Sequence, residues 1–113
     1  MKLKIIVTAL VLSLALPAAA QFKTIAAAYE IALSDIRLPQ RNAGTIAYRK
    51  CAECSYETKR VDESTVWEIN GKSMSLDDFR KALRDVADPD DETIQVLHHL
   101  ESDRVTKVWI LLR

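Results

Sequence analysis

Cys51 and Cys54, in the stretch RKCAECSYETK, are the residues of this chain best suited to chemistry. A pair at this spacing can form a structural disulfide, cycle between thiol and disulfide as a redox centre, or supply half of a zinc site. Each of these chemistries needs a different local structure around the sulfurs. The flanking sequence therefore decides between them.

A redox centre is favoured when the first cysteine begins a helix, because the helix dipole stabilises the thiolate. Residues 55–61 instead alternate and contain Thr, Tyr and Val, which is typical of a strand. With a two-residue turn between them, Cys51 faces Cys54 across a hairpin and Tyr48 faces Glu57. We predict a structural disulfide, and a small thiol–disulfide redox protein using the same pair is the alternative.

A zinc site is a poor fit, because a structural zinc ion takes four ligands. Only His98 and His99 could join the two cysteines, and adjacent side chains of a strand point to opposite faces. We predict no metal site and no cofactor. The sequence also lacks a Ser-His-Asp arrangement and a Gly-rich phosphate loop, so a non-catalytic protein is favoured.

The N-terminal residues have the pattern of an exported protein. Two lysines precede an apolar run over residues 5–16, which is short for a membrane span, and a proline and three alanines follow. We predict a signal peptide over residues 1–20, cut between Ala20 and Gln21, with a cut after Ala28 as the alternative. A periplasmic or secreted location without a stable membrane anchor follows, and cysteines there are usually oxidised.

The remaining residues, 21–113, are enough for a single small domain. The sequence holds 16 basic and 16 acidic residues. No excess of charge therefore points to nucleic acid or to an anionic membrane as a partner. We expect a monomer or weak dimer whose partner is a protein or peptide.

One helix is firmly predicted, over about residues 75–87. Ser75 can cap its first turn, which also contains two aspartates that complement the helix dipole. The apolar residues of this segment fall on one stripe at helical spacing. They are Leu76, Phe79, Leu83 and Val86.

Strands are predicted on both sides of this helix. They cover residues 45–50, 55–61, 65–69, 72–74, 93–100 and 104–113, with Asn70-Gly71 and Ser102-Asp103 as hairpin turns. The second turn sets Val96 opposite Trp109, and both tryptophans are predicted core residues. Residues 22–38 fit a helix or a strand, and we favour a strand over 28–34. Together these elements predict an α+β fold, a mostly antiparallel sheet or partly open barrel of several hairpins with one helix.

Residues 69–112 resemble the C-terminal half of bacterial protease-type PDZ domains. The resemblance runs from the strand-turn Ile69-Asn70-Gly71 through the helix stripe to Val108, Ile110 and Leu112 in the last strand. No Gly-Leu-Gly-like loop for a terminal carboxylate is present. The resemblance implies a groove beside the helix that receives an extended peptide by strand addition. Its lining residues would be Phe79, Ala82, Leu83 and Val86.

The expected function is accordingly that of an exported, non-catalytic binding or accessory domain. Its ligand would be a peptide, a protein or a component of the cell envelope.

Overall fold

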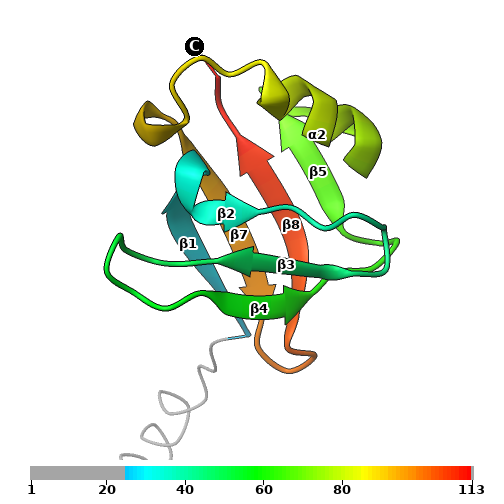
Figure 1. Cartoon of the computed structure of the whole chain (residues 1–113). Coiled ribbons are helices and arrows are strands. Elements are labelled where there is room, and N and C mark those ends of the chain that lie inside the picture. The colour runs from blue at the N-terminus through cyan, green and yellow to red at the C-terminus, as the bar shows by residue number, and fades with distance from the viewer. Residues whose placement is uncertain (1–24, 113) are drawn as a thin grey trace, which may run out of the picture.

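The computed structural model describes residues 25–112 (Figure 1). The predicted signal peptide and its cut site lie outside the described residues. Residues 25–112 form a mixed, mostly antiparallel open sheet of eight strands with one α-helix and two short 3-10 turns. The α+β class predicted from the sequence is confirmed.

The elements follow the chain in a simple order. They are β1 (Ala26–Ala32), the 3-10 turn η4 (Leu33–Asp35), β2 (Ile36–Arg37), β3 (Thr45–Tyr48), β4 (Glu57–Arg60), β5 (Val66–Ile69), β6 (Lys72–Met74), α2 (Leu76–Arg84), the 3-10 turn η5 (Pro89–Asp91), β7 (Thr93–His99) and β8 (Arg104–Ile110). The pattern of residues 22–38 fits a helix or a strand. In the structure, most of residues 25–38 belong to strands β1 and β2.

The sheet folds over on itself, so that two groups of strands face each other. The hydrogen-bonded order is β1-β7-β8-β4-β3-β2, with β5 paired to β8 and β6 paired to β5. Figure 1 shows β2, β3 and β4 lying across the steeper strands β1, β7, β8 and β5. The core fills the space between the two groups.

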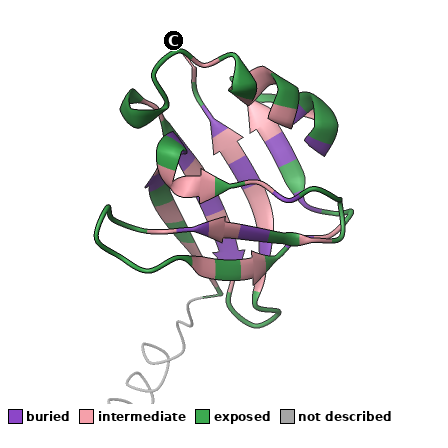
Figure 2. Cartoon of the chain, viewed as in Figure 1, coloured by how far each residue is buried: buried purple, intermediate pink, exposed green. Residues whose placement is uncertain are grey.

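The core combines side chains from both groups of strands and from the helix (Figure 2). Ile46 and Tyr48 of β3, Val96 of β7 and Val108 of β8 are all fully buried. Removing a Val or Ile side chain from water contributes about 1.5–3 kcal/mol. Trp67 is buried as predicted, and its ring centroid lies 5.3 Å from that of Phe79.

Helix α2 begins where the sequence predicts. The Ser75 Oγ accepts a hydrogen bond of 3.2 Å from the backbone N–H of Asp78, which caps the first turn. The helix ends at Arg84, three residues before the predicted end at 87. Val86 thus follows the helix, and its backbone N–H donates to the Leu83 carbonyl at 3.4 Å. The hairpin turn before the helix is confirmed, since Asn70 and Gly71 both have positive φ.

Strand β8 has a divided edge opposite β7. Its first residue, Arg104, pairs in parallel with Arg60 of β4, and its later residues pair in parallel with β5. The turn between β4 and β5 is fastened to β8 at this division. The buried hydroxyl of Thr65 donates to the Val105 carbonyl at 2.9 Å, and Arg104 forms an ion pair with Asp62.

The predicted register of the last hairpin is wrong. Val96 pairs with Val108 instead of Trp109, and a bulge after Leu97 shifts the pairing by one more position, so that His98 pairs with Val105. The connection between the two strands is residues 100–103, longer than the predicted two-residue turn Ser102-Asp103. The extra residue of a bulge lets the chain shift register within one hairpin. Trp109 therefore lies opposite Gln95 on the outer face, where the Lys107 ammonium stands 5.1 Å from its ring centroid.

Replacing Phe79 should detach the helix from the core. We expect Phe79→Ala to lower the free energy of unfolding by about 3 to 5 kcal/mol, because it leaves a cavity against Trp67. Urea denaturation followed by tryptophan fluorescence measures this loss. Lys81→Ala, on the exposed side of the same helix, should change stability by no more than about 0.5 kcal/mol. Equal effects of the two substitutions would contradict this packing.

Acid should weaken the β4–β5 turn. Hydrogen bonds from Ser64 and Arg104 lower the pKa of Asp62 from its ordinary value of 3.8 to about 2. A carboxylate with a depressed pKa stabilises the folded state above its unfolded pKa and loses that contribution as the pH falls through its folded pKa. Between pH 5 and pH 2, wild type should therefore lose more stability than Asp62→Asn. The control Asp90→Asn, at an exposed position of η5, should lose as much stability as wild type. If the free energy of unfolding falls equally with pH in all three proteins, the proposed role of Asp62 is refuted.

Candidate functional site

A disulfide joins Cys51 and Cys54, with the Cα atoms 5.0 Å apart. The predicted pairing of Tyr48 with Glu57 is confirmed, but the strand ladder stops there instead of continuing to the cysteines. The sulfurs thus close a turn at the tip of the β3–β4 loop, in which the Cys54 N–H donates to the Cys51 carbonyl at 3.1 Å. Both cysteines are exposed, and neither begins a helix.

Cations and aromatic rings fasten this loop to the rest of the sheet. Tyr56 lies beneath the guanidinium groups of Arg37 and Arg49, whose Cζ atoms are 4.5 and 5.2 Å from its ring centroid. Arg49 also donates a 2.7 Å hydrogen bond to Asp35. The loop is therefore held against the start of β2. This arrangement suits a structural bridge, because no helix dipole is present to stabilise a thiolate.

His98 and Asp103 form a second polar cluster, at the end of the β7–β8 hairpin. The buried His98 Nε2 lies 2.7 Å from an Asp103 carboxylate oxygen, and Lys59 lies 3.3 Å from the same oxygen. The hydrogen bond to His98 and then that to Lys59 lower the pKa of Asp103. The cluster fixes a turn residue with positive φ, so it acts on the shape of the hairpin.

The fully buried Tyr48 lies inside the fold behind this cluster. Burial, and to a smaller extent the charge of Glu57, raise its pKa to about 12. Its hydroxyl makes no hydrogen bond within residues 25–112. This phenol is neutral and enclosed, so it contributes packing to the core.

The four predicted groove residues do not line one groove. Phe79 is fully buried in the core, and Leu83 lines a groove on one side of α2. Ala82 and Val86 line a different depression on the other side, with Leu112 and four acidic residues. Because side chains leave a helix in all directions, a stripe read from sequence does not say which neighbours each side chain meets.

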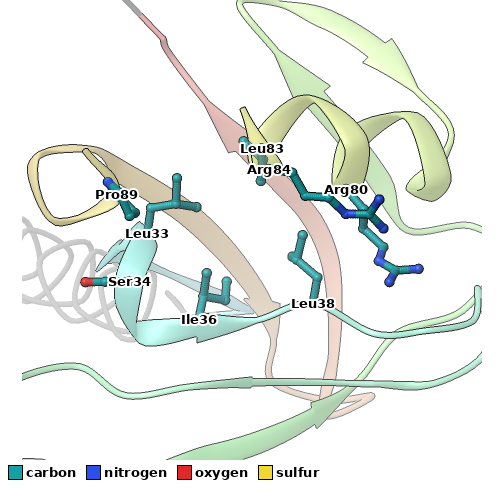
Figure 3. A pocket seen from close by; sticks show the side chains of 8 residues that line it. All are labelled: Leu33, Ser34, Ile36, Leu38, Arg80, Leu83, Arg84 and Pro89. Atoms are coloured by element: carbon teal, nitrogen blue, oxygen red, sulfur yellow. The ribbon is translucent and has the colours of Figure 1, made fainter. Parts of the chain in front are cut away.

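The groove beside Leu83 lies between α2 and the chain around β2 (Figure 3). Its volume is about 400 Å³, within the range of small-ligand and peptide-anchor sites. The floor is apolar, and Figure 3 shows Ile36 and Leu38 pointing toward the helix. The residues that line it are Leu33, Ser34, Ile36, Leu38, Arg80, Leu83, Arg84 and Pro89.

One wall of this groove is the free edge of a sheet. β2 is the last strand in the order and pairs only with β3, through Ile36 with Tyr48 and Arg37 with Ala47. Its other edge faces the groove, where no further strand pairs with it in the described part of the chain. An edge of this kind offers backbone N–H and C=O groups to an incoming extended segment.

The charge of the groove is positive. Arg80 and Arg84 are its only charged lining residues, and neither forms an ion pair within the described chain. Arg80 donates a 3.2 Å hydrogen bond to the neutral Gln40 side chain just beyond β2. The depression across the helix has the opposite charge, with Asp85, Asp88, Asp91 and Glu92 among its lining residues.

The sequence pattern missed the strand side of this groove. Leu33, Ile36 and Leu38 lie in a segment whose periodicity fits a helix or a strand. They also precede the groove residues of α2 by about forty to fifty positions in the sequence. The alternation of Ile36, Arg37 and Leu38 before Pro39 was the available signal, since it places two apolar side chains on one face.

Other kinds of site are not indicated by the structure. No three His, Cys, Asp or Glu side chains in residues 25–112 are placed to hold a metal ion. Within the same residues, no helix has the length and hydrophobicity needed to cross a membrane. No protein-family model, curated protein or solved structure matches the chain.

Removing the disulfide should cost stability without exposing an activity. We expect Cys51→Ser with Cys54→Ser to lower the free energy of unfolding by about 2 kcal/mol, the chain-entropy value for so short a loop. Urea denaturation of both proteins measures the difference.

The redox alternative is tested on the reduced wild type in an insulin-reduction assay, where we expect no rate above a dithiothreitol control. Catalysed reduction that Cys51→Ser abolishes would overturn the structural role.

Proposed function

We propose that this protein is an exported, non-catalytic domain that binds an extended peptide segment in the groove between α2 and β2. The single observation that carries the proposal is the combination of an unpaired strand edge with an apolar groove beside it. An extended peptide needs both features, since backbone hydrogen bonds supply affinity and side-chain pockets supply specificity.

The contacts around the groove favour a preformed site. Phe79 anchors α2 to the core, while the Arg49–Asp35 hydrogen bond and the pairing with β3 hold β2 in place. The Arg80–Gln40 hydrogen bond links the two walls. A groove with walls already fixed loses little entropy when a ligand enters, which favours binding.

The export part of the proposal is supported by the lysine, apolar and small-residue pattern of residues 1–20. The disulfide agrees with it, because such bonds persist mainly in oxidising compartments. The turn setting of the cysteines and their distance from any helix N-terminus favour binding over redox chemistry.

Peptide selection followed by NMR tests the binding function. Random ten-residue peptides would be selected on the purified domain, and the selected sequences would be synthesised with blocked ends. In ¹⁵N-labelled protein we expect shifts concentrated at Ile36, Arg37 and Leu38 and along α2. The amides of β2 should also exchange more slowly with solvent, because strand addition gives them hydrogen-bond partners.

Leu83→Ala and Val86→Ala form a matched pair for this experiment. Both truncate an apolar side chain near the end of α2, but only Leu83 lines the groove. Leu83→Ala should weaken the selected peptides about tenfold and Val86→Ala should leave them unchanged. Shifts confined to the β1 or β6 edge, or equal effects of the two variants, would sink the proposal.

A further inference from the structure

We infer that the groove selects extended segments carrying two side-chain carboxylates at alternate positions, followed two positions away by an apolar side chain. The inference rests on the proposed peptide-binding function and names its ligand class. It starts from the two arginines of α2, which are the charged groups of an otherwise uncharged, mostly apolar lining.

The spacing of the two arginines matches an extended ligand. Arg80 and Arg84 are four residues apart on α2, so they lie one turn along the same side, with a rise of about 6 Å. Alternate side chains of a strand share a face and repeat every 6.6–6.8 Å or so. A segment running along β2 can thus present one carboxylate to each guanidinium.

Both arginines lie on the side of α2 that borders the β2 segment, since both line the groove. Arg80 lies beside the Leu38 end, because it donates to Gln40, and Figure 3 shows the Arg84 side chain reaching back along the helix toward Arg80. A strand added to β2 would therefore pass both guanidinium groups.

The opposite charges on the two sides of α2 also determine which ligands the groove favours. Neither arginine has a carboxylate partner among residues 25–112, so an acidic segment would supply a counter-charge and could form charge-assisted hydrogen bonds. The acidic depression across the helix, beyond Ala82 and Val86, repels the same segment. An acidic peptide is therefore directed to the β2 side of α2.

The apolar position follows from the rest of the lining. Beyond Arg84 the groove continues between Leu33, Leu83 and Pro89, with Ser34 as the polar member there. A Val or Leu side chain two positions past the acidic pair would reach this end. Burying it would remove apolar surface from water at both partners.

Defined peptides with blocked ends test the inference. The probes are acetyl-Thr-Val-Thr-Glu-Thr-Glu-Thr-amide and its reversed sequence, since either direction can add to β2. Matched peptides replace both Glu by Gln, or place the two Glu side by side. Titration into ¹⁵N-labelled protein gives a dissociation constant for each, together with the location of the shifts.

We expect the alternate-Glu peptide, in its preferred direction, to bind at least about fivefold tighter than the Gln and adjacent-Glu peptides. Arg80→Gln and Arg84→Gln should each reduce that preference. In double-mutant cycles, the change in binding free energy from Glu→Gln in the peptide and that from Arg→Gln in the protein should not add. Lys81→Gln removes the same charge from an exposed position between them that does not line the groove. It should leave the preference intact.

Other outcomes separate the two proposals. Groove shifts of equal strength with Glu and Gln peptides would overturn the acidic preference and leave peptide binding standing. Equal binding of the alternate-Glu and adjacent-Glu peptides would also overturn it, because the inference depends on the spacing of the two carboxylates. Peptides selected at random that bind only away from the groove would remove the proposed function itself.

Discussion

Strand β8 divides one edge between two partners, and the groove depends on that division. Arg104 at its start pairs with β4, whereas its later residues pair with β5. Two strands cannot occupy the same stretch of edge, so β4 turns away and takes β3 and β2 across the core. The Thr65–Val105 hydrogen bond and the Arg104–Asp62 ion pair fix the crossing point. Because of this turn, β2 is the last strand of the sheet and lies close to α2. The chain reaches α2 through β5 and β6, at the same end of the molecule.

Local chemistry explains which parts of the fold could be predicted. Ser75 caps the first turn of its own helix, and Asn70 and Gly71 are residue types that readily adopt the positive φ of a hairpin turn. Such signals lie within a few residues. The β7–β8 register depends instead on a bulge after Leu97, which exchanges Trp109 for Val108 as the inward side chain. Alternation alone cannot locate a bulge, because both registers keep an apolar side chain on the inner face at most positions.

The candidate site was harder to predict because its walls are far apart in the chain. The resemblance to PDZ domains placed Leu83 in a groove together with Phe79, Ala82 and Val86. In the structure Phe79 is fully buried in the core, Leu83 borders β2, and Ala82 and Val86 face the acidic side. What separates these residues is the position of the β2 segment, which lies on the Leu83 side of α2. That position is set by the crossing at β8, for which the sequence carries no local signal.

The cysteine bridge affects the groove only indirectly. Its loop lies at the paired side of β2, where the Tyr56 ring contacts the guanidinium groups of Arg37 and Arg49, and Arg49 donates to Asp35. The loop therefore supports the paired edge of β2 and leaves the other edge uncovered. If the bridge opened, the loop would be held by the Arg49–Asp35 hydrogen bond and by the cation–aromatic contacts, which at exposed sites are worth only about 0.5–1 kcal/mol each. The short strand β2 is thus supported by the disulfide loop on its paired edge and borders the groove with its free edge.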